Sequence, residues 1–149
     1  MAGVKLVHVP YKGSSQSVTD VMGGQVQLTF DSLALGLPYV KAGKLRAVAT
    51  LGPKRVSQLP DVPTVGETLP GYEVTNWFGM VVPAATPRDI VMRLHREILK
   101  VLRLPEVRDN LIAQGTEPVG SSPEAFGAFM KSEAVKWARV IKEAGIRAD

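Results

Sequence analysis

The chain has 149 residues, of which 45% are hydrophobic, and it carries a formal net charge of +4 at pH 7. This length and apolar content suffice for one packed core, so we expect a globular chain of one domain or slightly more. The absence of cysteine excludes disulfides, thiolate catalysis and zinc–thiolate sites. No run of about eighteen apolar residues is present, which excludes a membrane-spanning helix.

The positive charge does not indicate a nucleic-acid partner. The 18 basic residues are scattered among 14 acidic ones, and the densest basic stretches, residues 41–54 and 93–108, are interrupted by apolar or acidic residues. The aromatic residues are not interleaved with basic clusters, as a stacking platform for bases requires. We therefore expect a solvated surface with a small preference for anionic ligands and no nucleic-acid partner.

The first pattern in the chain is an apolar run that ends at Pro10 and is followed by Gly13, Ser14 and Ser15, and then by helical spacing of apolar residues. This is the order of a strand, a tight loop and a helix N-terminus. The first turn of a helix has free backbone N–H groups, so Gly13, Ser14 and Ser15 are candidates for holding a carboxylate. The alternative is that the serines cap the helix, a contribution of about 1 kcal/mol. Both roles can coexist.

Strand-like and helix-like segments continue to alternate. The predicted strands are residues 5–9, 26–30, 45–49 and 78–82. The predicted helices between them are residues 15–22 and 33–42, stopped by Gly23-Gly24 and by Gly43. Strands separated by short helices predict parallel βαβ units and an α/β fold class.

From residue 52 to residue 73 the periodicity disappears, and prolines and glycines punctuate the chain. Because apolar residues persist there, we expect an ordered loop or a crossing between two subregions.

The last third of the chain predicts three helices. Thr86 is a candidate cap with Pro87 at the first helical position, and Pro105 ends that helix and begins a shorter one. The third helix starts at residues 122–124 and closes at Gly145. Apolar stripes on the first and third helices normally pack against a sheet. These stripes are Ile90, Val91, Leu94, Ile98, Val101 and Leu102, and then Phe126, Phe129, Met130, Trp137, Val140 and Ile141.

No catalytic constellation stands out. His8, Ser14 and Asp31 are the residue types of a serine triad, but the Gly-x-Ser-x-Gly turn is missing, and His8 lies mid-strand as a packed core histidine does. His95 is expected to be solvated. Two isolated histidines give no metal site, and no glycine motif matches a nucleotide-binding loop. The sequence predicts neither an enzyme nor a cofactor.

Two further residues, Asp31 and Trp77, each have two alternative roles. Asp31 ends a predicted strand, at the sheet edge where open α/β sheets bind ligands, but it can also be the N-cap of the following helix. Trp77 begins the strand after the proline-rich segment, and it can either pack in the core or form a wall of a ligand cleft.

Blocks in the same order resemble the bacterial tripartite tricarboxylate transporter solute receptors, often called Bug receptors. The blocks are residues 8–14 (HVPYKGS), 24–28 (GQVQL) with Phe30-Asp31, 42–47 (AGKLRA), 59–65 (LPDVPTV), 77–79 (WFG), 83–87 (PAATP) and 137–146 (WARVIKEAGI). The resemblance covers essentially the whole chain.

The resemblance implies a type II periplasmic binding-protein fold, in which two α/β domains close over a small carboxylate that is then passed to a membrane permease. Loop and helix-N-terminal amides typically hold the ligand in that family. The candidate ligand-binding residues are Tyr11, Gly13, Ser14, Ser15, Asp31 and Trp77. The alternative function is a truncated α/β interaction or small-molecule-sensing module that acts as an oligomer without transport.

The signal peptide and about half of the usual receptor, before the HVPYKG strand, have no counterpart in this sequence. We expect residues 3–75 to form the second, ligand-cleft domain and residues 76–149 to supply a strand and helices of an incomplete first domain. The helices at 87–104 and 123–144 would then expose apolar surface, which predicts a homo-oligomer. The resemblance implies a periplasmic protein, whereas a chain that starts at Met1 without a signal peptide would be cytoplasmic.

Overall fold

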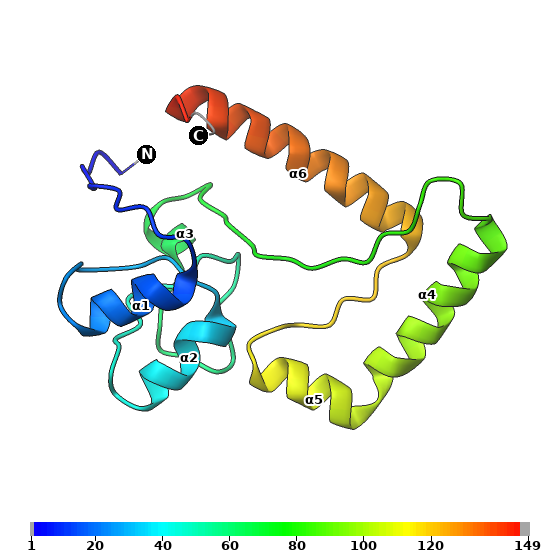
Figure 1. Ribbon diagram of the computed structural model, residues 1–149, viewed down its shortest axis with the longest axis horizontal. Coiled ribbons are helices and arrows are strands. Elements are labelled where there is room, and N and C mark those ends of the chain that lie inside the picture. The colour runs from blue at the N-terminus through cyan, green and yellow to red at the C-terminus, as the bar shows by residue number, and fades with distance from the viewer. Residues whose placement is uncertain (1, 147–149) are drawn as a thin grey trace. The chain divides into compact units, whose positions relative to one another are not determined.

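The computed structural model describes residues 2–146, and that range contains helices joined by irregular chain (Figure 1). The helices are α1 (Ser14–Met22), α2 (Leu33–Lys41), α3 (Val65–Thr68), α4 (Arg88–Arg103), α5 (Pro105–Ala113) and α6 (Pro123–Ala144). The helices predicted from the sequence are therefore confirmed. In the described part of the chain, no helix has both the length and the apolar content needed to cross a bilayer.

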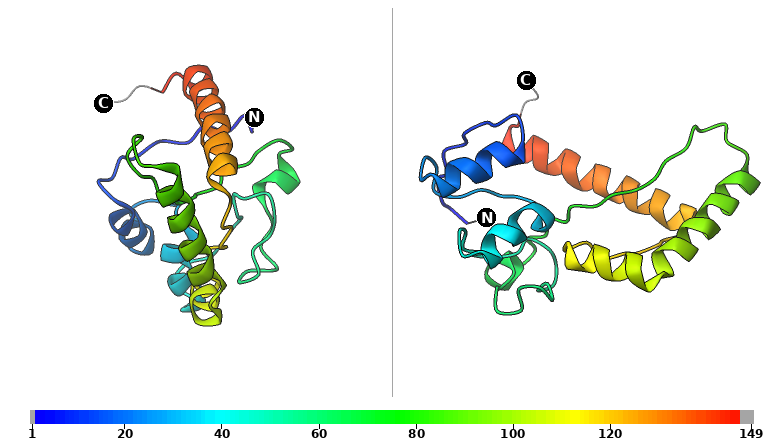
Figure 2. Two further views of the ribbon diagram at one scale, coloured as in Figure 1. Left: turned by 90° about the vertical axis from the view of Figure 1, so that its right-hand side faces the viewer. Right: turned by 60° about the horizontal axis from the view of Figure 1, so that its bottom comes forward.

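Two compact units make up the structure. The first contains the described residues up to Trp77 together with Asp109–Glu117, and the second contains Phe78–Arg108 and the residues from Pro118 onward. In the first unit, the Gln58 side-chain amide donates to the carbonyl oxygen of Ile112 and ties the end of α5 to the loop around residue 58. Figure 2 draws the helices from two further sides.

The start of α1 corrects one prediction. Gly13 is the N-cap, with an extended backbone (φ −176°), and Ser14 and Ser15 are the first two residues of the helix. Neither serine is therefore the cap. At the other end, Gly24 has the left-handed backbone (φ +74°) that the Gly23-Gly24 pair predicts.

The helix α3 lies within the segment predicted as an ordered loop. Thr64 and Glu67 form a reciprocal capping box: the Glu67 N–H donates to Thr64 Oγ1 (3.2 Å), and the Thr64 N–H donates to Glu67 Oε1 (3.0 Å). The Thr-x-x-Glu spacing is the known signature of such a start, and our sequence analysis missed it.

In the second unit, the helix ends follow local signals with small corrections. Pro87 rather than Thr86 is the N-cap of α4. Ser122 caps α6 by accepting the Ala125 N–H (3.1 Å), as predicted. His95, predicted to be solvated, is half-buried, and its Nε2 lies 3.1 Å from the Ser121 carbonyl oxygen.

The four predicted strands are not formed in the described residues. A strand exists only when its backbone pairs with a neighbour, and the pairing found is one isolated parallel bridge between Thr50 and Thr64. It consists of the Thr50 N–H donating to the Pro63 carbonyl (2.8 Å) and the Val65 N–H donating to the Thr50 carbonyl (2.9 Å). His8 is exposed in the unpaired first segment, so the expected core histidine is also not observed.

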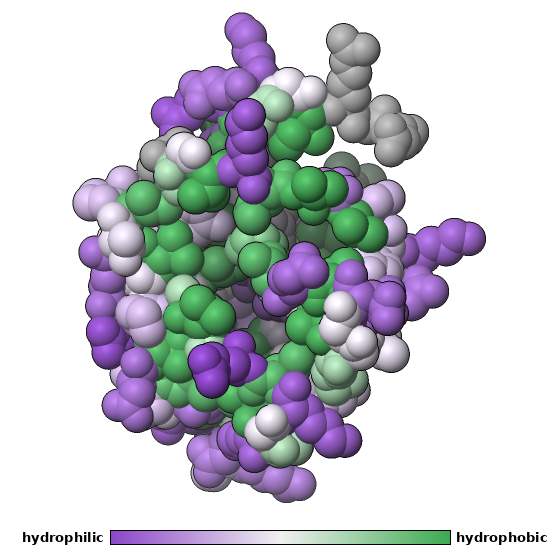
Figure 3. Space-filling view, turned by 90° about the vertical axis from the view of Figure 1, so that its left-hand side faces the viewer, coloured by the Kyte–Doolittle hydropathy of each residue, from purple (hydrophilic) through white to green (hydrophobic). Residues whose placement is uncertain are grey.

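Burial is sparse. Val18 on α1 and Leu37 on α2 are the buried apolar residues of the described chain, and both lie in the first unit. On α4, Ile90, Leu94 and Val101 are 42–50% exposed, so half of the six residues predicted to pack against a sheet are exposed. Figure 3 shows hydrophobic side chains exposed on the face that it draws.

Candidate carboxylate-binding site

The N-terminus of α1 presents free hydrogen-bond donors. The Gln16 N–H bonds to the Gly13 carbonyl (3.2 Å), while helix geometry leaves the N–H groups of Ser14 and Ser15 without an intrahelical acceptor. Both residues are exposed, and the first turn of α1 contains no acidic side chain to occupy these donors. The end of the helix is therefore open to an anion, and the helix dipole favours negative charge there.

A hydrogen-bonded chain fastens the segment before Asp31 to the same turn of α1. Thr29 Oγ1 donates to Ser17 Oγ (3.2 Å), and Ser17 Oγ donates to the Ser14 carbonyl oxygen (2.9 Å). Asp31 follows Thr29 by two residues, which places the two α-carbons at most about 7 Å apart. These hydrogen bonds thus tie the segment that leads into Asp31 to the N-terminal part of α1.

Only one of the two Asp31 carboxylate oxygens accepts a hydrogen bond from the described residues. Its Oδ1 accepts the Ser32 N–H at 2.7 Å, whereas its Oδ2 is buried and accepts no hydrogen bond from the described residues. Ser32, not Asp31, is the N-cap of α2, so the capping role considered for Asp31 is wrong. A buried carboxylate oxygen without a donor is costly, which makes Oδ2 a ready acceptor for a ligand or a water molecule.

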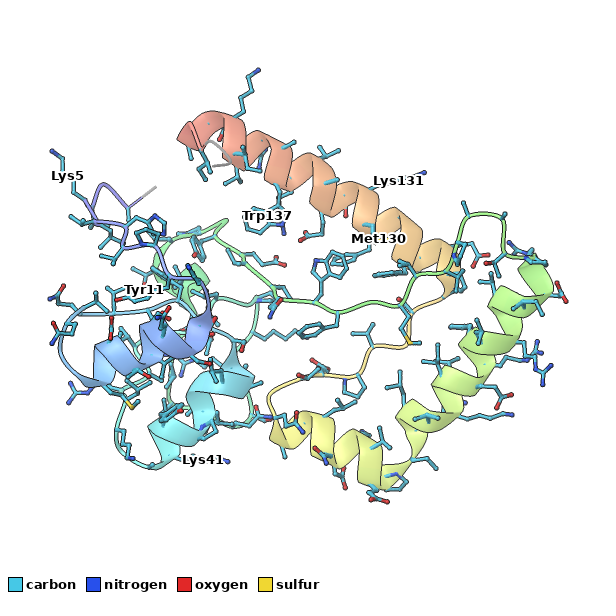
Figure 4. All side chains as sticks on the ribbon, viewed as in Figure 1. Lys5, Tyr11, Lys41, Met130, Lys131 and Trp137 are labelled. Carbon is cyan, nitrogen blue, oxygen red and sulfur yellow. The ribbon has the colours of Figure 1, made fainter. Side chains whose placement is uncertain are left out.

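Tyr11 is held against α1. Its hydroxyl donates to Asp20 Oδ2 (2.8 Å), and this hydrogen bond raises the pKa of Tyr11. Asp20 lies on α1, so the contact fixes the chain just before Gly13 relative to the helix. Figure 4 shows Tyr11 beside α1. The residue therefore positions the loop that leads into the free N–H groups.

Trp77 is the sixth predicted site residue. It is 38% exposed and lies at the end of the first unit's long continuous segment. The sequence predicted six site residues, and the structure relates Tyr11, Gly13, Ser14, Ser15 and Asp31 through α1 and its contacts.

A separate hollow of about 350 Å³ in the first unit is lined by Thr64, Glu67 and Tyr72, among others, and contains none of the six predicted residues. Beside it, Arg55 Nη2 pairs with Glu67 Oε2 at 2.6 Å. This pair, together with the Thr64 N–H, lowers the pKa of Glu67 to about 2. These contacts brace the loop around α3.

A model of a known family matches residues 1–146, and it is described as the tripartite tricarboxylate transporter family receptor. This is a class of solute-binding receptors, not of enzymes; its members work in the periplasm, bind small carboxylates and serve a transporter. The chain belongs to the tripartite tricarboxylate transporter receptor family.

This chain spans about half the length of several similar curated proteins. It is 39% identical to a UPF0065 protein of Pseudomonas sp. strain P51, over 99% of this chain and 45% of that protein. It is 33% identical to BugT of Bordetella pertussis, over 97% of this chain and 45% of that protein. A UPF0065 protein of Pseudomonas knackmussii, also 33% identical, is nearer in length, since the match covers 94% of this chain and 84% of that protein.

Solved structures show the same fold. Rpa4515 of R. palustris, solved with adipate, is 37% identical with a TM-score of 0.88, over 98% of this chain and 49% of that one. The periplasmic binding protein BugD is 34% identical with a TM-score of 0.85, over 99% of this chain and 50% of that one. These similarities support a periplasmic-binding-protein fold, of which this chain matches about half.

Proposed function

We propose that this chain binds small carboxylates as a solute receptor, or as part of one, and delivers them to a tripartite tricarboxylate transporter. The observation that carries the proposal is the open N-terminus of α1, whose first turn begins with two exposed serines and contains no acidic residue. The adipate found with the similar R. palustris protein supports a dicarboxylate as the class of solute.

Each candidate residue has a role in ligand binding that follows from its chemistry. The N–H groups of Ser14 and Ser15 hold a ligand carboxylate, and Gly13 allows it to approach the backbone closely. Asp31 repels a second carboxylate, so its free Oδ2 accepts a hydrogen bond from a ligand hydroxyl or a water molecule. Tyr11 positions the loop, and Trp77 contributes an apolar wall.

The domain organisation is part of the proposal. Residues 3–75 form the second domain, with a parallel sheet, and residues 76–149 contribute to the first. We place the working protein in the periplasm and assign it no catalytic activity. The family match favours the receptor over a sensing or interaction module.

We also propose that the isolated chain self-associates through the exposed apolar residues of its helices. Sedimentation across a range of concentrations tests this: a growing dimer or higher oligomer supports self-association, and a monomer at every concentration contradicts it.

The test of the site removes one N–H without removing the helix. Ser14 is the first residue of α1, where proline is accepted, and extended Gly13 suits a residue before proline. Ser14→Pro should weaken adipate binding by about tenfold or more, because a hydrogen bond to a charged group contributes roughly 1.5–3 kcal/mol. Ser14→Ala keeps the N–H and should bind as the wild type does.

Isothermal titration calorimetry measures the affinity, and circular dichroism checks that both variants retain their helices. Equal adipate affinity in Ser14→Pro and Ser14→Ala would contradict the proposed site.

A further inference from the structure

Two hydroxyl side chains, Ser17 and Thr29, join two segments that the proposed site needs in fixed positions. Ser17 lies on α1 three residues after Ser14, and Thr29 lies two residues before Asp31. Thr29 Oγ1 donates to Ser17 Oγ (3.2 Å), and Ser17 Oγ donates to the Ser14 carbonyl oxygen (2.9 Å). Figure 1 shows the chain turning back after α1 toward α2, and this contact fastens the returning segment to the helix.

A polar stripe on one side of α1 makes such contacts possible. Ser14, Ser17 and Asp20 recur at a spacing of three residues, which places them next to one another on the helix surface. Ser17 accepts the hydroxyl of Thr29, from the segment that follows the helix. Asp20 accepts the hydroxyl of Tyr11 (2.8 Å), from the loop that precedes it. The stripe therefore fastens the chain on both sides of α1.

The contact between Ser17 and Thr29 is partly withdrawn from water, because both residues are half-buried. A hydrogen bond in such a place competes less with solvent and is electrostatically stronger than one in water. Thr19 on the same helix differs, since it is exposed and its hydroxyl donates to the Ser15 carbonyl of α1 itself (2.9 Å). The bond of Thr19 stays within the helix, which makes Thr19 a matched comparison for Thr29.

The position of Asp31 decides which ligands the proposed site accepts. Its buried Oδ2 has no donor among the described residues, and an ionised carboxylate can only accept hydrogen bonds. A ligand hydroxyl that lies within about 3 Å of Oδ2 supplies the missing donor. If the segment before Asp31 moves, this bond lengthens and weakens, while the repulsion between Asp31 and the ligand carboxylate remains.

We propose that Ser17 and Thr29 are positioning residues that make the carboxylate site specific for hydroxy acids, because they hold the segment before Asp31 against the N-terminal part of α1. Both act through Asp31 and not through contact with the ligand. The amides at the start of α1 bind the ligand carboxylate, and the hydroxyl pair fixes where the ligand hydroxyl meets its acceptor. This inference rests on the proposed function, but the contact itself can be tested without a ligand.

The first experiment measures malate and succinate affinity by calorimetry for the wild type and for Thr29→Val, which keeps the branched shape and loses the hydroxyl. The malate-to-succinate affinity ratio should fall by about threefold or more, because a full hydrogen bond to a charged group contributes about tenfold or more. Succinate affinity should change little, since succinate has no hydroxyl. Thr29→Ser restores the donor and should restore the ratio, and the control Thr19→Val should keep it.

The second experiment uses the chain without a ligand. Ser17→Ala and Thr29→Val are combined in a double-mutant cycle, and urea unfolding followed by circular dichroism gives the free energy of unfolding of each variant. The double variant should lose less stability than the sum of the two single variants, because both substitutions remove the same hydrogen bond. Thr19→Val combined with Thr29→Val should give additive losses.

The possible results separate this inference from the proposed function. A wild type that binds neither acid would overturn the carboxylate site and the positioning role together. A wild type that prefers malate, with the same preference in Thr29→Val, would overturn the positioning role and leave the carboxylate site standing. So would an equal loss of malate and succinate affinity in Thr29→Val, or additive losses of stability for Ser17→Ala and Thr29→Val.

Discussion

In the second unit, Gly79 packs against the ring of Phe126, and this contact leaves no room for a side chain at position 79. A β-carbon added there would lie 2.7 Å from Cε1 and 2.8 Å from Cε2 of the Phe126 ring. Such distances are shorter than van der Waals contact, so the ring or the strand-like segment would have to move. The glycine thus allows residues 78–82 to lie directly on α6.

Gly79→Ala should destabilise the chain by about 1–3 kcal/mol, the usual cost of overpacking. Urea unfolding monitored by circular dichroism measures it. The control is Gly127→Ala on α6, where the added carbon meets nothing within 4 Å, and better helix propensity should stabilise by about 0.5–1 kcal/mol. Similar shifts of the unfolding midpoint in both variants would show that Phe126 does not limit position 79.

Glu67 should make the stability of the folded chain decrease at acidic pH. Its folded pKa of about 2 lies below the ordinary 4.5, because Arg55 and the Thr64 N–H stabilise its carboxylate. A lowered folded pKa contributes stability that is complete above pH 4.5 and is lost as the pH falls toward 2. Carbon-detected NMR titration of the Glu67 carboxyl group should find its midpoint near that low value.

Arg55→Gln removes the ion pair and keeps the capping box, so it should move the Glu67 midpoint upward. If the midpoint stays unchanged in this variant, Arg55 is not the main cause of the shift.

Asp31 should favour ligands that carry a hydroxyl group. Its buried Oδ2 has no donor among the described residues, so malate, which can donate a hydrogen bond to it, should bind more tightly than succinate, which cannot. Asp31→Asn should reduce this preference and strengthen succinate binding, because the variant removes a negative charge near the ligand. Calorimetric titration of both acids measures the ratio of their affinities.

Asp61→Asn serves as the control for net charge, since Asp61 is an exposed residue of the same unit. It should keep the preference of the wild type. A malate-to-succinate ratio that is the same in wild type and Asp31→Asn would rule out the proposed role of Asp31.

Local signals in the sequence predicted the helices well, because the residues that start and stop a helix act within a few positions. Ser122 before Pro123 marks the start of α6, and Gly24 supplies the left-handed turn after α1. The four predicted strands are not formed in the described residues, because a strand requires a backbone partner that can lie far away in the sequence, and local patterns do not identify that partner.

The candidate site was predicted in part. The order of Gly13, Ser14 and Ser15 predicted a helix start, and the structure confirms that start with Gly13 as its cap. The contact from Thr29 to Ser17 joins residues twelve positions apart, and no pattern in the sequence indicates it. The missing hydrogen bond at the buried Oδ2 of Asp31 likewise depends on burial, which the spacing of residues in the sequence does not predict.

The most direct test of the account follows the backbone amides of the ¹⁵N-labelled chain by NMR during titration with adipate. The account predicts saturable shifts that are largest at Ser14 and Ser15, with smaller shifts at Asp31. Sodium chloride at the same ionic strength should not reproduce them, because bound carboxylate is held by directed hydrogen bonds rather than by screening. Adipate shifts that are identical to those of the salt, or that leave Ser14 and Ser15 unmoved, would contradict carboxylate binding at α1.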